Sequence, residues 1–226
     1  MIMNKNIFVA CDVSSQREIL ELLAKVHTEI SGIKIGLQYI TQNCSENIRE
    51  LSKFEKPIFY DGKFFDIKNT LVESIKSLKN LNISYATVHL MNGIDSLKAA
   101  NEVANKINVK LLGVSVLTSF NNEDLIKLGF KDNLEQQVLR LIKIADEAKL
   151  YGVICSPMEI KMIKKIAPNL KCFTPGIRQN KNEDDQKRTM NAKQALEAGS
   201  DCLIIGRPIT KGDPKKNIQE ILSSLK

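Results

Sequence analysis

The sequence predicts a single α/β domain, a closed barrel of eight parallel strands in which each strand is followed by a helix. Short β-branched runs alternate with longer helical patterns about eight times in 226 residues. The strand candidates are apolar at nearly every position, as parallel strands covered on both faces are. No linker rich in Pro, Gly or Ser divides the chain. We therefore expect one (β/α)8 TIM barrel over residues 1–226.

The strand candidates are spread over the whole chain. They are Ile7–Asp12, Ile33–Gly36, Pro57–Lys63, Tyr85–Leu90, Val109–Val116, Gly152–Ser156, Cys172–Gly176 and Asp201–Gly206. Between them apolar residues recur about every 3.6 positions, the period of a helix with one buried face. The clearest stripes are Ile19, Leu23, Val26 and Ile30; Leu71, Ile75 and Leu78; Leu134, Val138, Leu141 and Ala145; and Ile218, Ile221, Leu222 and Leu225. Asn121–Asp132 fits neither pattern, and is either a short extra helix or an irregular loop.

The main alternative fold is an open, doubly wound sheet. That fold often carries a Gly-x-Gly-x-x-Gly turn after its first strand. Here the first strand candidate runs into Asp12-Val13-Ser14, which has no glycine. The barrel is therefore the favoured prediction.

The composition is that of a folded globular protein, with 43% hydrophobic and 26% charged residues. No apolar run approaches the ~20 residues that span a bilayer. The chain reaches Asp12 too early for a secretory signal. These features predict a cytoplasmic protein without a membrane partner.

The net charge of +7 raises the question of a nucleic-acid partner. The lysines are spread among acidic residues and Asn, and aromatic residues make up only 5% of the chain. This pattern favours a solvated basic surface over a nucleic-acid interface. A phosphorylated small-molecule substrate would also suit a positive barrel mouth.

The thiols and imidazoles argue against disulfides and metal sites. The five cysteines form no Cys-x-x-Cys pair, and four of them lie in or beside apolar runs. They are interpreted as reduced thiols that act as small core residues. With only two histidines, His27 and His89, a histidine-based metal cluster is not expected.

Charged residues gather at the predicted carboxyl end of the third strand, where barrels place their catalytic groups. Asp61 and Lys63 are two residues apart and should point to the same side. Lys34 lies on the neighbouring strand, and Asp66 follows within reach of the same mouth. Alternating opposite charges keep one another ionised, so a lysine there stays protonated and can donate a proton to a carbanion. The structural alternative is a salt-bridge network that only closes the barrel.

Two glycine turns near the carboxyl end of the chain indicate a phosphate site. Arg178 follows Gly176-Ile177, and Arg207 follows Gly206 directly, in a chain with few arginines. Barrels often bind phosphate at the loops after strands seven and eight, where glycine lets backbone N–H groups approach the oxygens. Arginine adds bidentate pairing. The alternative is that both turns are purely structural.

The segment Asp61-Gly62-Lys63-Phe64-Phe65-Asp66-Ile67 resembles the Asp-x-Lys-x-x-Asp-Ile signature of the orotidine 5′-phosphate decarboxylases. The similarity extends over nearly the whole chain. It includes Ala10-Cys11-Asp12, Lys34-Ile35-Gly36-Leu37, Thr87-Val88-His89, Val116-Leu117-Thr118-Ser119, Pro175-Gly176-Ile177-Arg178, Asp185-Gln186-Lys187-Arg188 and Ile205-Gly206-Arg207-Pro208-Ile209-Thr210. The resemblance implies decarboxylation of orotidine 5′-phosphate to uridine 5′-phosphate, the last step of uridylate synthesis, without a metal or organic cofactor.

The resemblance also implies roles for single residues. Lys63 would donate a proton to C6 of the pyrimidine as carbon dioxide leaves, within a charged network of Lys34, Asp61, Lys63 and Asp66. Asp66 would lie beside the substrate carboxylate, entering from the other subunit of a homodimer together with Ile67 and Thr70. Asp12 and Lys34 would bind the ribose hydroxyls, and Thr118 and Ser119 would contact the pyrimidine. Gln186 would contact both pyrimidine and phosphate, and the phosphate would be bound by Arg178, Gly206 and Arg207, with Pro175 in the same turn.

Several positions depart from the usual bacterial pattern of this family. Gly62 replaces a bulkier apolar residue, Phe65 stands where His is common, and Lys68 stands where Pro is common. The segment Gln179–Asp185 lacks the usual Gly and Pro, and Asn191 replaces a frequent Pro. We expect effects on loop stiffness, hence on rate and affinity rather than reaction type.

Two other functions compete with this interpretation. Metal-dependent phosphosugar decarboxylases and hexulose-phosphate synthases share the Asp-x-Lys-x-x-Asp strand, but they usually have an acidic residue where this chain has Lys34. A basic nucleic-acid-binding module or a non-catalytic barrel would leave the Lys-Asp-Lys-Asp arrangement unexplained, and would bind nucleic acid with a steep salt dependence.

Overall fold

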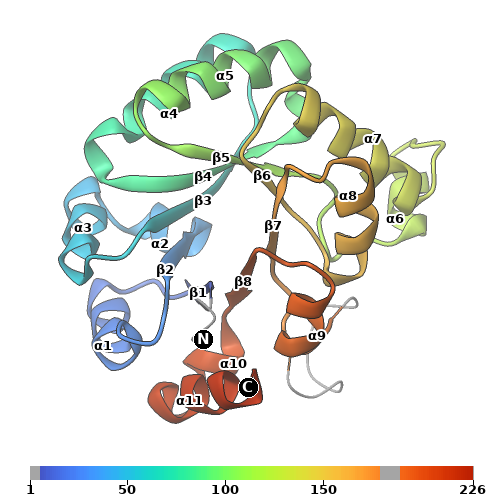
Figure 1. The fold of residues 1–226 in the computed structure, drawn as a ribbon. Helices are drawn as coiled ribbons and strands as arrows, with labels where there is room; N and C mark the ends of the chain where they lie inside the picture. The colour runs from blue at the N-terminus through green and yellow to red at the C-terminus, as the bar shows by residue number, and fades with distance from the viewer. Residues whose placement is uncertain (1–5, 179–188, 226) are drawn as a thin grey trace.

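Eight parallel strands close into a barrel in chain order, with β8 paired back to β1 (Figure 1). The computed structural model describes residues 6–178 and 189–225. The strands are β1 (Ile7–Cys11), β2 (Gly32–Gly36), β3 (Ile58–Phe64), β4 (Ile83–His89), β5 (Lys110–Val114), β6 (Gly152–Ile154), β7 (Lys171–Thr174) and β8 (Cys202–Ile205). Each strand candidate overlaps one of them, and the predicted barrel is confirmed.

Helices surround the barrel on its outer side (Figure 1). The α-helices are α1 (Gln16–Val26), α2 (Leu37–Gln42), α3 (Ser45–Glu50), α4 (Lys68–Ser77), α5 (Ile94–Lys106), α6 (Asn122–Lys127), α7 (Leu134–Glu147), α8 (Ile160–Ile166), α9 (Ala192–Glu197), α10 (Arg207–Thr210) and α11 (Pro214–Ser224). Short 3-10 segments are η1 (Leu51–Phe54), η2 (Leu78–Leu81), η3 (Leu90–Asn92) and η4 (Pro157–Glu159).

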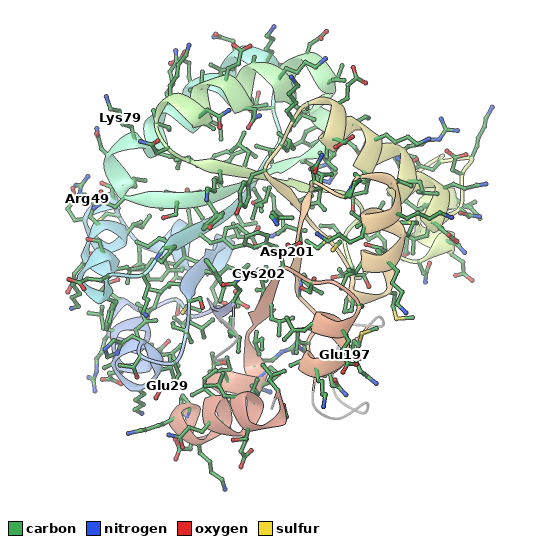
Figure 2. All side chains as sticks on the ribbon, in the orientation of Figure 1. Glu29, Arg49, Lys79, Glu197, Asp201 and Cys202 are labelled. Carbon is green, nitrogen blue, oxygen red and sulfur yellow. The ribbon has the colours of Figure 1, made fainter. Side chains whose placement is uncertain are left out.

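The outer helices bury the apolar stripes that predicted them. In α1 the Ser15 hydroxyl caps the first turn by accepting from the N–H of Glu18, and Ile19 and Leu23 are fully buried against the barrel. Charged residues face the other way, and Figure 2 shows Arg49 and Lys79 pointing away from the barrel. The layered burial therefore follows from the sequence period.

The undecided segment Asn121–Asp132 contains a short helix, α6. The side chain of Asn121 accepts from the N–H of Asp124, and the Asp124 carboxylate accepts from the N–H of Asn121. This reciprocal capping stabilises a helix that apolar periodicity alone does not predict.

Aromatic rings fill the interior of the barrel toward the amino ends of the strands. Phe8, Phe59 and Phe173 pack edge to face, with ring centroids 6.0 to 6.5 Å apart. Tyr85 lies 5.3 Å from Phe173, and Tyr151 lies 5.9 Å from Tyr85. These contacts close the lower half of the barrel, and only the half at the carboxyl ends is left for a site.

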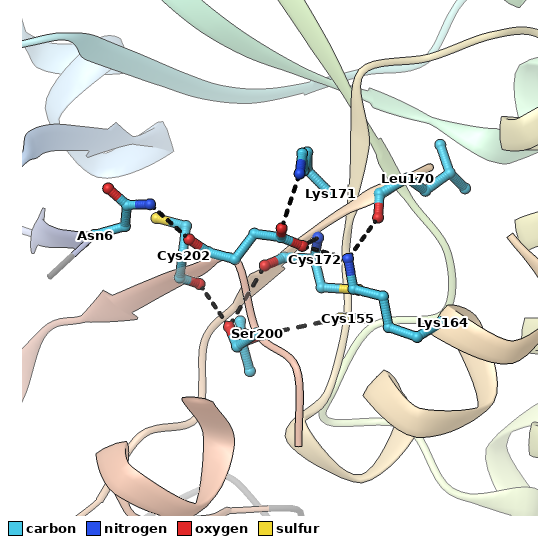
Figure 3. Close-up of polar contacts among 10 residues, drawn as sticks. Asn6, Cys155, Lys164, Leu170, Lys171, Cys172, Ser200 and Cys202 are labelled. Carbon is cyan, nitrogen blue, oxygen red and sulfur yellow. Dashed lines mark hydrogen bonds and ion pairs between the residues drawn. The ribbon is translucent and has the colours of Figure 1, made fainter. Parts of the chain in front are cut away.

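Asp201, just before β8, ties neighbouring elements together through contacts with Asn6, Lys164, Lys171 and Cys172, which are labelled in Figure 3. Its carboxylate pairs with Lys164 of α8 and with Lys171 of β7, and it accepts the backbone N–H of Cys172 at 2.8 Å. Its carbonyl accepts from the side chain of Asn6 at 3.0 Å. Burial disfavours the charged carboxylate, but the Lys164 contact and the other donors prevail and lower the pKa of Asp201. This cluster fastens the seam at which β7, β8 and the start of β1 meet.

The cysteines occupy the positions expected of reduced thiols. Cys11, Cys155, Cys172 and Cys202 are buried and free, whereas Cys44 is exposed and free. Burial raises the pKa of the Cys11 and Cys202 thiols, so both stay protonated at neutral pH. The prediction that the thiols act as small core residues is confirmed for these four and is wrong for Cys44, which is exposed. In residues 6–178 and 189–225, no helix has both the length and the apolar character to cross a membrane.

Candidate active site

A cavity of about 210 Å³ opens at the carboxyl ends of the strands. Most of the predicted site residues line it, and they come from strands far apart in the sequence. The lining residues predicted from sequence are Asp12, Lys34, Asp61, Lys63, Thr118, Pro175, Arg178, Gly206 and Arg207. The barrel thus assembles one site from residues scattered over most of the chain.

The charged cluster on one wall centres on the carboxylate of Asp61, which is only 6% exposed. Lys34 Nζ and Lys63 Nζ each lie 2.9 Å from Asp61 Oδ2. Lys34 Nζ is also 3.6 Å from Asp12 Oδ1. The parallel register places Gly36 beside Asp61, and a β-carbon at Gly36 would lie 3.2 Å from Asp12 Oδ1. The bare glycine therefore leaves room for the ion pairs.

The ion pairs of the cluster keep Asp61 and Lys34 charged. Burial disfavours the ionised carboxylate, but Lys34 and then Lys63 more than offset it and lower the pKa of Asp61 to about 2. Burial also disfavours the Lys34 ammonium, yet Asp61 and then Asp12 raise the pKa of Lys34 above its ordinary value. At neutral pH the site thus holds a buried anion shared by two cations.

The end of β3 bulges where it carries these residues. Tyr60 pairs with Ala86 and Phe64 with Val88, so four steps along β3 match two along β4. Lys63 lies in this bulge with a φ of +47°, in the left-handed region that costs a non-glycine residue about 1 kcal/mol or more. Such bulges often re-aim a side chain beside an active site. Here the bulge turns Lys63 Nζ toward Asp61.

The unusual glycine at position 62 has a local steric cause. The rings of Tyr60 and Phe64 stack at a centroid distance of 5.7 Å with an interplanar angle of 6°. A β-carbon at Gly62 would lie 2.7 Å from the Tyr60 ring. The stacked rings therefore occupy the space that a larger side chain at position 62 would need.

Asn92 braces the turn after β3. Its Nδ2 donates to the carbonyls of Phe64, at 2.9 Å, and His89, at 2.8 Å. Its Oδ1 accepts the backbone N–H of Asp66 at 3.1 Å. Lys68 stands where a stiffening proline is common in the resembled family, and these three hydrogen bonds hold the turn from the side of β4.

The part of the cavity wall formed by the turns after β7 and β8 is cationic. β7 and β3 are four strands apart in the closed ring of eight, so they face each other across the barrel. Arg178 follows β7, whereas Arg207 follows β8, which pairs with β1. Both arginines line the cavity, together with Pro175, Gly176 and Gly206. This wall carries the guanidinium groups and glycine turns that suit a phosphate.

Apolar residues to which the sequence analysis assigned no role at the site also line the cavity. Those from the strands are Ala10, Val114, Ile154 and Ile204, and Val116 and Leu117 follow β5. Their positions at the carboxyl ends of strands, with side chains directed into the barrel, are the feature that could have identified them from the sequence. They give the space between the two charged walls an apolar surface, which suits a flat ring.

The remaining predicted residues do not line the cavity. Asp66, Ile67, Thr70 and Ser119 are exposed outside it, and Ile67 is 73% exposed. For Ser119 a substrate contact therefore stays a prediction without a cavity position. Gln186 and the Gln179–Arg188 segment lie outside the described residues.

The described residues contain no group of three or more His, Cys, Asp or Glu side chains arranged to hold a metal ion. The two carboxylates that line the site, those of Asp12 and Asp61, both contact the Lys34 ammonium. A cation is thus already supplied by the chain at the position between them.

Comparison with known proteins agrees with this geometry. The Orotidine 5'-phosphate decarboxylase / HUMPS family matches residues 5–221. The orotidine 5'-phosphate decarboxylase of Wolbachia pipientis subsp. Culex pipiens is 36% identical over 221 residues, covering 97% of this chain and 98% of the relative. That of Ehrlichia canis is 37% identical over 221 residues, covering 97% of each. A crystal structure of orotidine 5'-phosphate decarboxylase from Lactobacillus acidophilus superposes with a TM-score of 0.86 at 30% identity, covering 98% of this chain and 99% of that one. The chain belongs to the Orotidine 5'-phosphate decarboxylase / HUMPS family.

Proposed function

We propose that this chain is a carboxy-lyase that converts orotidine 5′-phosphate to uridine 5′-phosphate and carbon dioxide, in the last step of uridylate synthesis. The observation that carries the proposal is the Lys34–Asp61–Lys63 cluster, which lines one cavity together with Arg178 and Arg207. The two walls match the two ends of a nucleotide monophosphate. The curated relatives that match this chain over nearly their whole length are named for this activity.

Lys63 is the proposed proton donor. The bond between C6 of the pyrimidine and its carboxylate carbon breaks, carbon dioxide leaves, and the electron pair stays on C6. The Lys63 ammonium transfers a proton to that carbon. Asp61, held anionic by two lysines, lies 2.9 Å from the ammonium that gives up the proton.

The other walls position the substrate. Lys34 and Asp12 bind the ribose hydroxyls, and Thr118 contacts the pyrimidine. Arg178, Arg207 and the Gly206 backbone bind the phosphate, and Gln186 reaches both pyrimidine and phosphate. Binding energy from the phosphate then helps to hold the reacting carbon beside Lys63.

The active enzyme in this proposal is a homodimer that shares its sites. Asp66 and Ile67 lie outside the cavity of their own subunit. Phe65, which is 60% exposed and whose ring lies tilted against that of His89 at a centroid distance of 5.3 Å, adds to an apolar patch beside them. Such a patch is typical of an interface. If a second copy of the chain covers this patch, Asp66, Ile67 and Thr70 of the first copy lie at the cavity of the second.

Asp66 acts by repulsion in this scheme. Two like charges ~4 Å apart repel by about 4 kcal/mol at an effective dielectric near 20. Placing Asp66 beside the substrate carboxylate therefore raises the energy of the bound substrate, and loss of carbon dioxide relieves it.

The test is to mix the purified protein with orotidine 5′-phosphate and follow the loss of ultraviolet absorbance without added metal. We expect turnover that EDTA does not change, because Lys34 supplies the positive charge between Asp12 and Asp61. Activity that EDTA abolishes and magnesium restores would assign the chain to the metal-dependent branch. No turnover in either condition would refute the proposed reaction.

A cytoplasmic setting belongs to the same proposal. The free thiols of the described chain support it, because reduced cysteines are the norm in that compartment.

A further inference from the structure

The bulge in β3 gives the backbone of Lys63 an unusual hydrogen-bond partner. The N–H of Lys63 donates to Thr87 Oγ1 at 2.8 Å, which is a side-chain oxygen of β4. Thr87 is fully buried. The left-handed backbone of Lys63 is therefore held in place by a hydroxyl on the neighbouring strand.

The same hydroxyl also contacts the carboxylate at the centre of the charged cluster. Thr87 Oγ1 donates to Asp61 Oδ1 at 2.9 Å. The other oxygen, Asp61 Oδ2, accepts from both lysines. An ionised carboxylate only accepts hydrogen bonds, so the Thr87 proton must point to Asp61, and its lone pairs are left for the N–H of Lys63. The donor and the acceptor of each of these hydrogen bonds are therefore determined.

These contacts form a closed ring. It runs from Asp61 Oδ1 to the Thr87 hydroxyl, to the Lys63 backbone, along the Lys63 side chain, and back to Asp61 Oδ2. A valine has nearly the same shape as threonine and suits a buried strand better. The hydroxyl is thus present for these two hydrogen bonds, because an unbonded one would destabilise the core.

We propose that Thr87 is a positioning residue that fixes the Lys63 ammonium and the Asp61 carboxylate in their reacting geometry. Thr87 does not line the cavity and acts through its two neighbours. The inference rests on the proposed function, since it concerns the group that donates the proton. It adds a residue that the signature Asp-x-Lys-x-x-Asp does not contain.

The test compares Thr87→Val, which removes the hydroxyl but keeps the shape, with Thr87→Ser, which keeps the hydroxyl. For Thr87→Val we expect kcat to fall by roughly 10- to 100-fold, the size expected for loss of a hydrogen bond to a charged group. KM for orotidine 5′-phosphate should change by less than about threefold, because the phosphate wall is untouched. Thr87→Ser should recover most of kcat.

The matched control is Thr174→Val, which removes another fully buried threonine hydroxyl, one bonded to Ser200 at 2.8 Å. We expect Thr174→Val to lower Tm with little change in kcat. Wild-type kcat in Thr87→Val would overturn the inference. The inference would also be overturned if kcat fell in parallel with Tm in both valine variants and Thr87→Ser did not restore kcat.

A second measurement does not depend on turnover. Amide hydrogen exchange at Lys63, followed by NMR, should be slow in the wild type and in Thr87→Ser, and faster in Thr87→Val. Equal protection in all three proteins would overturn the inference even if the wild type were inactive. Failure of the proposed function is seen separately, as absence of turnover in the wild type.

Discussion

The ammonium groups of Lys34 and Lys63 approach the same oxygen, Asp61 Oδ2, at 2.9 Å each. Two cations on different strands are thereby held around one buried anion. The arrangement makes the three residues interdependent, because removal of either lysine takes away one of the two cations that lower the pKa of Asp61. This interdependence shapes the predictions below.

Lys63→Ala should abolish turnover while substrate binding is kept in part. Loss of the proton donor is expected to lower kcat by about 10³-fold or more, whereas Arg178 and Arg207 still hold the phosphate. The measurements are the absorbance assay and calorimetric titration with orotidine 5′-phosphate. Lys79→Ala, at an exposed lysine on the outer ring, is the control. Equal rates in Lys63→Ala and the wild type would remove Lys63 as the donor.

Arg207→Ala should chiefly weaken binding. A charged hydrogen bond to phosphate contributes about 1.5–3 kcal/mol, so KM should rise by roughly 10- to 150-fold. Steady-state kinetics measure this, with Arg49→Ala on α3 as the control for loss of an arginine from the surface. An unchanged KM would place the phosphate elsewhere.

Mixing Lys63→Ala and Asp66→Ala proteins should restore activity if the sites are shared. A heterodimer of the two variants carries one site with both residues intact and one with neither. Random exchange makes half of the dimers mixed, which gives roughly a quarter of the wild-type activity. Subunit exchange is confirmed by native mass spectrometry. Exchange without recovery would contradict the assignment of Asp66 to the partner's cavity.

Asp61 should stabilise the folded protein in a defined pH window. Its pKa is about 2 in the folded state against an ordinary value of 3.8, so the unfolded chain binds a proton first as pH falls. The ionised form then contributes about 2 kcal/mol above pH ~4, and the contribution is lost as pH falls toward ~2. The free energies of unfolding of wild type and Asp61→Asn, measured against pH, should converge over this window. A difference that is constant from pH 7 to pH 2 would argue against the charged cluster.

Asp201→Asn should destabilise the barrel without affecting the chemistry. The substitution leaves Lys164 and Lys171 without their anion at the seam of β7 and β8. We expect the free energy of unfolding to fall by about 2 kcal/mol, measured by urea denaturation. Glu197→Gln, at an exposed carboxylate on α9, should change stability by less than about 0.5 kcal/mol. Similar effects of both substitutions would mean that the Asp201 cluster is energetically unimportant.

The sequence predicted the fold and the centre of the site because both depend on spacing. Asp61 and Lys63 are two residues apart, and Lys34 is on the adjacent strand, so the parallel sheet brings them together. The two glycine turns identified the cationic wall in the same way. These relationships survive small errors in the ends of strands.

Other features depend on register and on single side-chain contacts, which spacing does not reveal. The bulge at Lys63 and its left-handed φ leave no periodic signal. Thr87 is an ordinary strand residue by propensity, and Asn92 an ordinary turn residue, until their hydrogen bonds are seen. The departures at positions 62 and 68 predict an effect on the stiffness of the loop after β3, but they do not reveal the stacked rings and the Asn92 hydrogen bonds that support this loop.

The aromatic packing beneath the cavity has a kinetic consequence for the proposed reaction. Within the described part of the chain, Phe8, Phe59 and Phe173 block passage toward the amino ends of the strands. Substrate and products must then enter and leave through the same opening of the cavity, at the carboxyl ends of the strands. The nucleotide product has to leave the cavity before the next substrate molecule binds, so uridine 5′-phosphate should be a competitive inhibitor with respect to orotidine 5′-phosphate.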